Sequence, residues 1–165
     1  MKQHFITNGS IKIEALEWEG TNPSLTPILF IPGMLGRAES FAKEIESHWQ
    51  DRRCVSMSLR GRGRSEAPVT GYSLDDHASD IAAVVRGLKL DRGVIVVAHS
   101  RGVPYALRFV ELHPQAVVTL ALMDHRLCIE RSRPRGPSGG VRATERISQR
   151  RKPFGPFREN LISKI

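Results

Sequence analysis

The sequence contains only two cysteines, Cys54 and Cys128, and they form neither a CxxC pair nor another spacing typical of metal ligands. We therefore expect no disulfide framework and no metal site, and we place the protein in the reducing cytoplasm. No apolar run approaches the roughly 20 residues that a membrane-spanning helix needs. The N-terminus also lacks the apolar segment of a secretory signal, so we expect no membrane partner.

Positive and negative side chains balance over most of the chain. Residues 1–125 contain 14 Lys/Arg and 14 Asp/Glu, whereas residues 126–165 contain 11 and 3, which is the whole net charge of +8. The second segment is rich in Arg, Pro, Gly and Ser, which offer little to bury. We therefore divide the chain into a core, residues 1–125, and a basic tail, residues 126–165, which we expect to be poorly ordered.

The basic tail could attract phosphates without sequence preference. No aromatic residue interleaves its arginines between residues 131 and 152, so base stacking and a specific nucleic-acid partner are not expected. The abrupt change of composition near residue 126 is typical of a chain that has been truncated or altered in reading frame.

Strand-like and helix-like patterns alternate along residues 1–125. Residues 4–19 alternate apolar and polar side chains around Asn8-Gly9, which predicts an antiparallel hairpin. Phe41, Ile45 and Trp49 are spaced four apart and mark one face of a helix. Ser73 is a candidate N-cap for a second helix. The pattern indicates an α/β protein with a mostly parallel sheet and helices on both faces, with strands expected within residues 27–33, 53–59, 93–98 and 116–124.

The segment VIVVAHSRGVPYALRFVELHP, residues 94–114, joins a strand-like run to a helical pattern at Ser100. The sequence around it, AHSRG, departs by one residue from the G-x-S-x-G turn, with Ala98 for the first glycine. Small residues at Ala98 and Gly102 suit a sharp turn that lifts the serine hydroxyl clear of the sheet. The alternative is a plain N-cap serine, and the flanking strand and helix favour the nucleophile elbow.

A serine nucleophile needs hydrogen-bond donors for the oxyanion that develops during acyl transfer. The backbone N–H of Arg101 is one candidate. The glycine-rich segment PGMLGRAES, residues 32–40, follows a buried strand and supplies the second, the N–H of Met34. The segment lacks the Lys-Ser/Thr of a phosphate-binding loop, and RGRGRS at residues 60–65 lacks the third glycine of a dinucleotide site. We therefore expect no cofactor.

Three stretches together resemble the α/β-hydrolase fold family: PGMLGRAESF, SLRGRGRSEAPVTGYSLDDHASDI and VAHSRGVPYALRFVELHP. They occur in the order and spacing of that family, and the resemblance covers about residues 10–125, its N-terminal part. The resemblance implies Ser100 as nucleophile and an oxyanion hole from Met34 and Arg101. A serine at this position argues against the dehalogenase and epoxide-hydrolase branches, which use Asp. Pro32, Ser58 and Ala98 depart from the usual family residues.

The general base is the missing part of this machinery. The resemblance places a catalytic histidine after the last strand of the family, and no such histidine follows here. Asp124, at the end of the last predicted strand, is a candidate acid. His125, which directly follows that strand, is a candidate base in an arrangement new to the family. We expect a surface position for His113, at the end of the helix that follows Ser100, and a packing or orienting role for His99. The remaining histidines, at positions 4, 48 and 77, are also expected on the surface.

The leading hypothesis is therefore a serine hydrolase that cleaves an ester, lactone or amide of a small-molecule substrate through an acyl-enzyme. Because the late histidine is missing, we expect this chain to be weak or inactive. The alternative is a non-catalytic member of the family, or a truncated fragment of one, that binds a small ligand or a partner protein.

Overall fold

The computed structural model describes residues 1–90 and 93–125. The predicted basic tail lies outside the described residues, so the domain division remains a prediction. None of the described helices has the length and apolar character needed to cross a bilayer. In chain order the elements are β1 (Lys2–Asn8), β2 (Ile11–Trp18), β3 (Ile28–Ile31), η1 (Ala38–Phe41), α1 (Ala42–His48), β4 (Cys54–Met57), α2 (Leu74–Gly87), β5 (Val94–His99), α3 (Gly102–Leu112), η2 (Pro114–Ala116) and β6 (Val117–Met123).

The strands form one sheet in the order β1-β2-β4-β3-β5-β6. β1 and β2 form the predicted hairpin, and Gly9 closes it with φ 62°, a left-handed conformation that glycine adopts without steric cost. β2 is antiparallel to β4, whereas β4, β3, β5 and β6 run parallel to one another. The predicted α/β class, the mostly parallel sheet and the N-terminal hairpin are confirmed.

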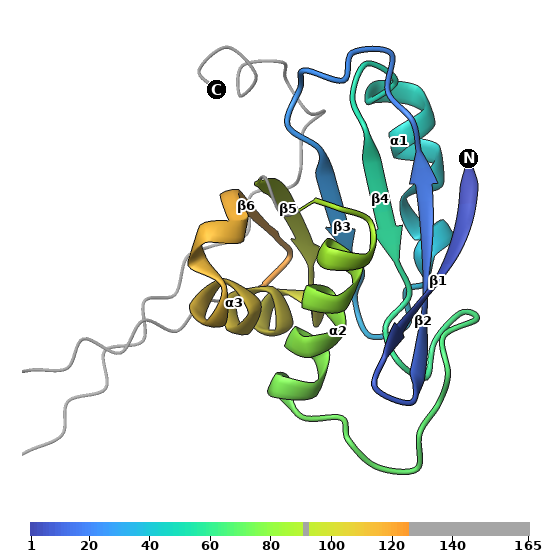
Figure 1. Ribbon diagram of the computed structural model, residues 1–165, viewed down its shortest axis with the longest axis vertical. Helices are drawn as coiled ribbons and strands as arrows, with labels where there is room; N and C mark the ends of the chain where they lie inside the picture. The colour runs from blue at the N-terminus through green and yellow to red at the C-terminus, as the bar shows by residue number, and fades with distance from the viewer. Residues whose placement is uncertain (91–92, 126–165) are drawn as a thin grey trace, which may run out of the picture. The chain divides into compact units, whose positions relative to one another are not determined.

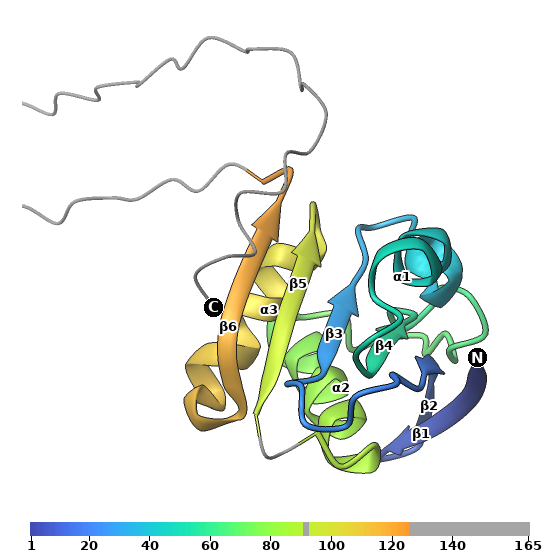
Figure 2. The same ribbon diagram turned by 90° about the horizontal axis from the view of Figure 1, so that it is seen from above.

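Helices cover both faces of the sheet, as predicted. On one face α2 and α3 lie side by side and bury the larger core, in which Ile81 and Phe109 are almost fully enclosed (Figures 1 and 2). On the other face η1 and α1 bury a smaller core around Phe30 and Ile45. Phe41 and Trp49 pack against this second core, which confirms the predicted apolar face of the helix. Parallel strands with both faces covered are apolar on both sides, which explains their continuous apolar runs.

Ser73 is the N-cap of α2, as predicted. Its hydroxyl accepts a hydrogen bond from the Asp76 N–H, and the Asp76 carboxylate accepts one from the Ser73 N–H at 2.9 Å. This reciprocal pair satisfies two of the backbone donors that every helix leaves free at its N-terminus. The helix therefore starts at a defined residue, which fixes the position of the side chains along it.

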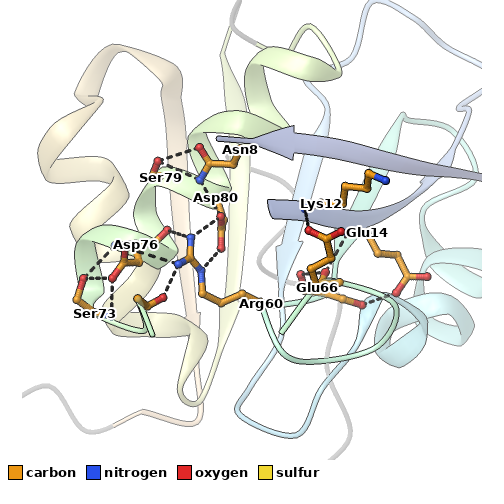
Figure 3. A network of polar contacts seen from close by, with 12 residues as sticks. Asn8, Lys12, Glu14, Arg60, Glu66, Ser73, Asp76, Ser79 and Asp80 are labelled. Carbon is orange, nitrogen blue, oxygen red and sulfur yellow. Dashed lines mark hydrogen bonds and ion pairs between the residues drawn. The ribbon is translucent and has the colours of Figure 1, made fainter. Parts of the chain in front are cut away.

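A buried ion pair joins α2 to the turn that follows β4. The guanidinium of Arg60 donates to both carboxylate oxygens of Asp80, at 2.6 and 2.8 Å, and both residues are almost fully buried. Asn8, at the tip of the hairpin, donates to the same carboxylate at 2.8 Å (Figure 3). A buried carboxylate with this many donors is satisfied rather than isolated. Three segments far apart in the sequence therefore meet at Asp80.

His77 is not on the surface, and our expectation for it is wrong. Its side chain is 4% exposed and stacks on the Tyr105 ring with the ring centroids 3.8 Å apart. Burial, followed by the positive charge of Arg60, lowers the pKa of His77 to about 4. His4 also has a partner, because its Nε2 lies 2.7 Å from a carboxylate oxygen of Glu17. In both cases a partner from another element decides the environment of the ring.

We predict that His77 makes the fold less stable as the pH falls. The folded protein keeps this ring neutral down to pH about 4, whereas the unfolded chain protonates it near pH 6.5. Between these values only the unfolded state binds the proton, so the stability contribution is complete above pH 6.5 and is lost toward pH 4. The linkage corresponds to about 2 kcal/mol between pH 7.5 and pH 5.

The measurement is urea unfolding of wild type and His77→Gln at pH 7.5 and pH 5. The variant should lose less stability between the two pH values than wild type does. His48→Gln, at an exposed position on α1, is the matched control and should behave as wild type. An unchanged pH dependence in His77→Gln would show that this ring is not the group that titrates.

Candidate functional site

Ser100 lies at the turn where β5 ends and α3 begins, as the sequence predicts. Its φ is 49°, a left-handed conformation that is uncommon for a residue other than glycine. Its N–H donates to the carbonyl of Met123 on β6 at 2.8 Å, and its carbonyl accepts from the Val103 N–H at 3.1 Å. Backbone strain of this kind persists only where the surroundings determine the conformation, and it gathers at functional sites.

Two glycines allow the end of β3 to approach this turn. A Cβ on Gly102 would lie 2.5 Å from the Pro32 carbonyl oxygen and 2.7 Å from that of Ile31. A Cβ on Gly33 would lie 3.1 Å from His99 Nδ1 and 3.3 Å from Ser100 Cβ. The glycine-rich loop after β3 is therefore in direct contact with the serine turn, which brings together the two segments singled out in the sequence.

The loop forms a tight turn in which the Gly36 N–H donates to the Gly33 carbonyl at 3.0 Å. Because C=O and N–H point in opposite directions across a trans peptide, this bond turns the Met34 N–H out of the turn. The Arg101 N–H precedes the first turn of α3, where backbone donors have no partner within the helix. In the described part of the chain, neither N–H donates to another backbone group.

The side chains of the loop face solvent. Met34 is 55% exposed and Leu35 is 84% exposed. The backbone of the loop contacts the serine turn while these two apolar side chains extend outward. Such an arrangement offers apolar surface directly beside the free N–H groups.

Asp124 follows β6 with φ 50°, and its exposed carboxylate lies 3.8 Å from Nε2 of His99. Sequence reasoning gave His99 only a packing or orienting role and missed this contact with Asp124. The parallel pairing of β5 with β6 could have indicated this contact. His99 pairs in register with Met123, so it lies close to Asp124, the residue after Met123. His125 is exposed, and no described hydrogen bond or ion pair joins it to Ser100 or Asp124.

No group of three or more His, Cys, Asp or Glu side chains that could hold a metal ion occurs within residues 1–90 and 93–125. A cavity of about 570 Å³ lies by the start of β5, lined by residues such as Asn22, Arg53 and Lys89. These residues precede β3, β4 and β5, at the end of the sheet opposite Ser100. The candidate site therefore consists of the serine turn and the loop after β3.

Comparison with known proteins agrees with this architecture. Residues 26–137 match the sequence profile of the alpha/beta hydrolase fold. A 2-(acetamidomethylene)succinate hydrolase of Mesorhizobium japonicum is 31% identical over 133 residues, which are 77% of this chain and 45% of the relative. Epoxide hydrolase 1 of Caenorhabditis elegans is 34% identical over 109 residues, which are 65% of this chain and 25% of the relative. The crystal structure of Cfl2 from Burkholderia cenocepacia superposes with a TM-score of 0.69 at 22% identity, covering 82% of this chain and 46% of that one.

A mostly parallel sheet with helices on both faces, and a sharp strand-to-helix turn after β5, define the class of this protein. The chain belongs to the α/β-hydrolase fold family. It spans less than half the length of the relatives described above.

We predict that Gly102→Ala destabilises the fold by about 1–3 kcal/mol, the usual cost of overpacking. The new methyl group would meet two backbone carbonyls of the β3 end, which cannot move without disturbing the sheet. Urea unfolding measures the change. Gly87→Ala is the matched control, because the nearest atoms to its new methyl group belong to the side chain of Ile6 and not to backbone. Equal stability of the two variants would contradict the close packing at the serine turn.

Proposed function

We propose that Ser100 is the nucleophile of a serine hydrolase that acts on an ester, lactone or amide bond. The observation that carries the proposal is the left-handed conformation of Ser100 between β5 and α3, against the glycine-rich loop. A serine in this turn precedes the N-terminus of α3, where the helix dipole favours developing negative charge. The Mesorhizobium and Caenorhabditis relatives described above are hydrolases by name.

In the proposed reaction the Ser100 hydroxyl attacks a carbonyl carbon and a tetrahedral oxyanion forms. The N–H groups of Met34 and Arg101 would hold this oxyanion, because both belong to segments in contact at Ser100 and neither donates to another described backbone group. The carbonyl then re-forms as the alcohol or amine leaves with a proton, which gives an acyl-enzyme. Water attacks this ester and releases the acid.

The proton from Ser100 needs an acceptor, and no described histidine is hydrogen-bonded to it. His99 directs Nε2 toward Asp124, and His125 is exposed. General-base assistance typically contributes 10²–10⁴-fold to a rate. We therefore propose that this chain reacts slowly at Ser100, and that any residual rate comes from the oxyanion donors.

The substrate is proposed to be a small molecule, in keeping with the named substrate of the Mesorhizobium relative. An epoxide hydrolase is also among the relatives. We do not favour epoxide hydrolysis for this chain. The family resemblance implies that the epoxide-hydrolase branch uses Asp as the nucleophile, and this chain has Ser100 at that position. We also propose a cytoplasmic location, where a reducing environment would keep the two cysteines as thiols.

The first test is covalent labelling with an alkyl fluorophosphonate, followed by peptide mass spectrometry. The probe should modify Ser100, and Ser100→Ala should lose the label. Ser10→Ala, at an exposed position in the hairpin turn, is the control and should label as wild type. A folded wild-type chain that takes up no label would instead support a non-catalytic family member that binds a small ligand or a partner.

The second test is hydrolysis of a nitrophenyl ester by wild type, Ser100→Ala and His125→Ala. We expect a slow rate that falls in the Ser100 variant and is unchanged in the His125 variant. Turnover at ordinary enzyme rates that disappears in both variants would show that His125 serves as the base, contrary to this proposal.

A further inference from the structure

The turn at residues 58–66, between β4 and α2, is bonded to both ends of the glycine-rich loop. At the far end of the loop, the Ala38 N–H donates to the Ser58 hydroxyl oxygen at 2.8 Å. The same hydroxyl donates to Glu14 on β2 at 2.8 Å. Ser58 and Glu14 are fully buried. The end of the loop is therefore tied to the sheet by hydrogen bonds that water does not reach.

Glu14 also holds the turn itself in place. Its carboxylate accepts from the Arg64 N–H at 2.8 Å and from the Gln3 side chain at 2.6 Å. Its own N–H donates to the Ser65 hydroxyl at 2.9 Å (Glu14 is labelled in Figure 3). A buried carboxylate with three donors is satisfied, and moving any donor would leave a polar group without a partner. The turn is therefore a rigid support.

Arg62 extends from this support to the other part of the loop. Its Nε donates to the Met34 carbonyl at 2.7 Å, and its Nη1 donates to the Gly61 carbonyl at 2.8 Å. The second bond holds the guanidinium on its own turn, so the first bond transmits the position of that turn to the loop. No described carboxylate lies within ion-pair distance of Arg62, so charge pairing does not explain where its side chain lies.

These bonds fix both peptide groups that flank Met34. The carbonyl before it, that of Gly33, accepts from the Gly36 N–H within the turn. The carbonyl of Met34 itself accepts from Arg62. The first plane carries the Met34 N–H opposite the Gly33 carbonyl, so the bond within the turn sets the direction of that N–H. The second plane carries the Met34 carbonyl, so the Arg62 bond holds Met34 from its other side and keeps the residue from rotating.

We propose that Arg62 is a positioning residue that holds the Met34 loop in the conformation it adopts over Ser100. The role in catalysis rests on the proposed function above, since it assumes that the Met34 N–H receives the oxyanion. Arg62 acts through the loop and does not touch the reacting atoms. A misplacement of about 1 Å in such a donor can reduce a rate by as much as 10²-fold. Because the Arg62 side chain is exposed and the loop keeps its inner turn bond, we expect a smaller effect, about tenfold.

The experiment compares Arg62→Ala with Arg64→Ala in the full chain. Both arginines are exposed residues of the same turn and both changes remove one positive charge. The side chain of Arg64, however, bonds only to Gln3 in the described structure, at 3.2 Å. Arg62→Lys is the conservative variant, because an ammonium can still donate to the Met34 carbonyl.

The first readout is hydrogen exchange of the Gly36 amide, whose bond to Gly33 reports on the loop. Exchange should become several times faster in Arg62→Ala, stay unchanged in Arg64→Ala, and return toward wild type in Arg62→Lys. Thermal unfolding should be similar in all four proteins. Equal exchange in the Arg62→Ala and Arg64→Ala variants would overturn the proposal.

The second readout is fluorophosphonate labelling of Ser100, resolved into probe affinity and the maximal labelling rate. Arg62→Ala should lower the maximal rate about tenfold with affinity unchanged, because the donor acts in the transition state. A rate equal to that of Arg64→Ala would overturn the catalytic part of the inference. If wild type itself is not labelled, the proposed function fails, and Gly36 exchange still decides whether Arg62 holds the loop.

Discussion

The close approach of β3 to the turn at Ser100 is the constraint on which the rest of the site depends. Gly102 has no room for a side chain against the carbonyls of Ile31 and Pro32, and Gly33 lies against His99 and Ser100 in the same way. Ser100 keeps its left-handed conformation because Met123 on β6 binds its N–H from the other side. Three parallel strands thus hold one residue that would otherwise relax to a commoner conformation.

Two buried carboxylates connect this parallel part of the sheet to the antiparallel hairpin. Asp80 accepts hydrogen bonds from Arg60, in the turn after β4, and from Asn8, at the tip of the hairpin. Glu14, on β2, accepts hydrogen bonds from the Ser58 hydroxyl and from the Arg64 N–H, both in that turn. Burying such groups is costly unless every oxygen has donors, and the donors here come from the hairpin and from the turn after β4. The polar network therefore specifies one arrangement of the hairpin, the turn and the loop, in addition to contributing to stability.

Most of the fold could be predicted from local signals. Asn8-Gly9 between alternating runs indicates the hairpin, because that pair favours the left-handed turn it needs. The spacing of Phe41, Ile45 and Trp49 indicates the buried face of a helix, and Ser73 indicates where the next helix begins. Small residues on either side of Ser100, between a strand and a helix, indicate the sharp turn. In each case the physical cause lies within a few residues of the pattern.

The sequence by itself thus determined the elements, their order and the serine turn, since backbone sterics, capping and hydrophobic periodicity act over short distances. Only the tertiary structure decided that His77 is buried on Tyr105, that Asp124 lies by His99, and that Arg62 holds the Met34 carbonyl. Each of these contacts joins residues from different elements, so it depends on strand order and register. A periodic pattern shows which face of an element is buried but carries no information about the residue that will face it.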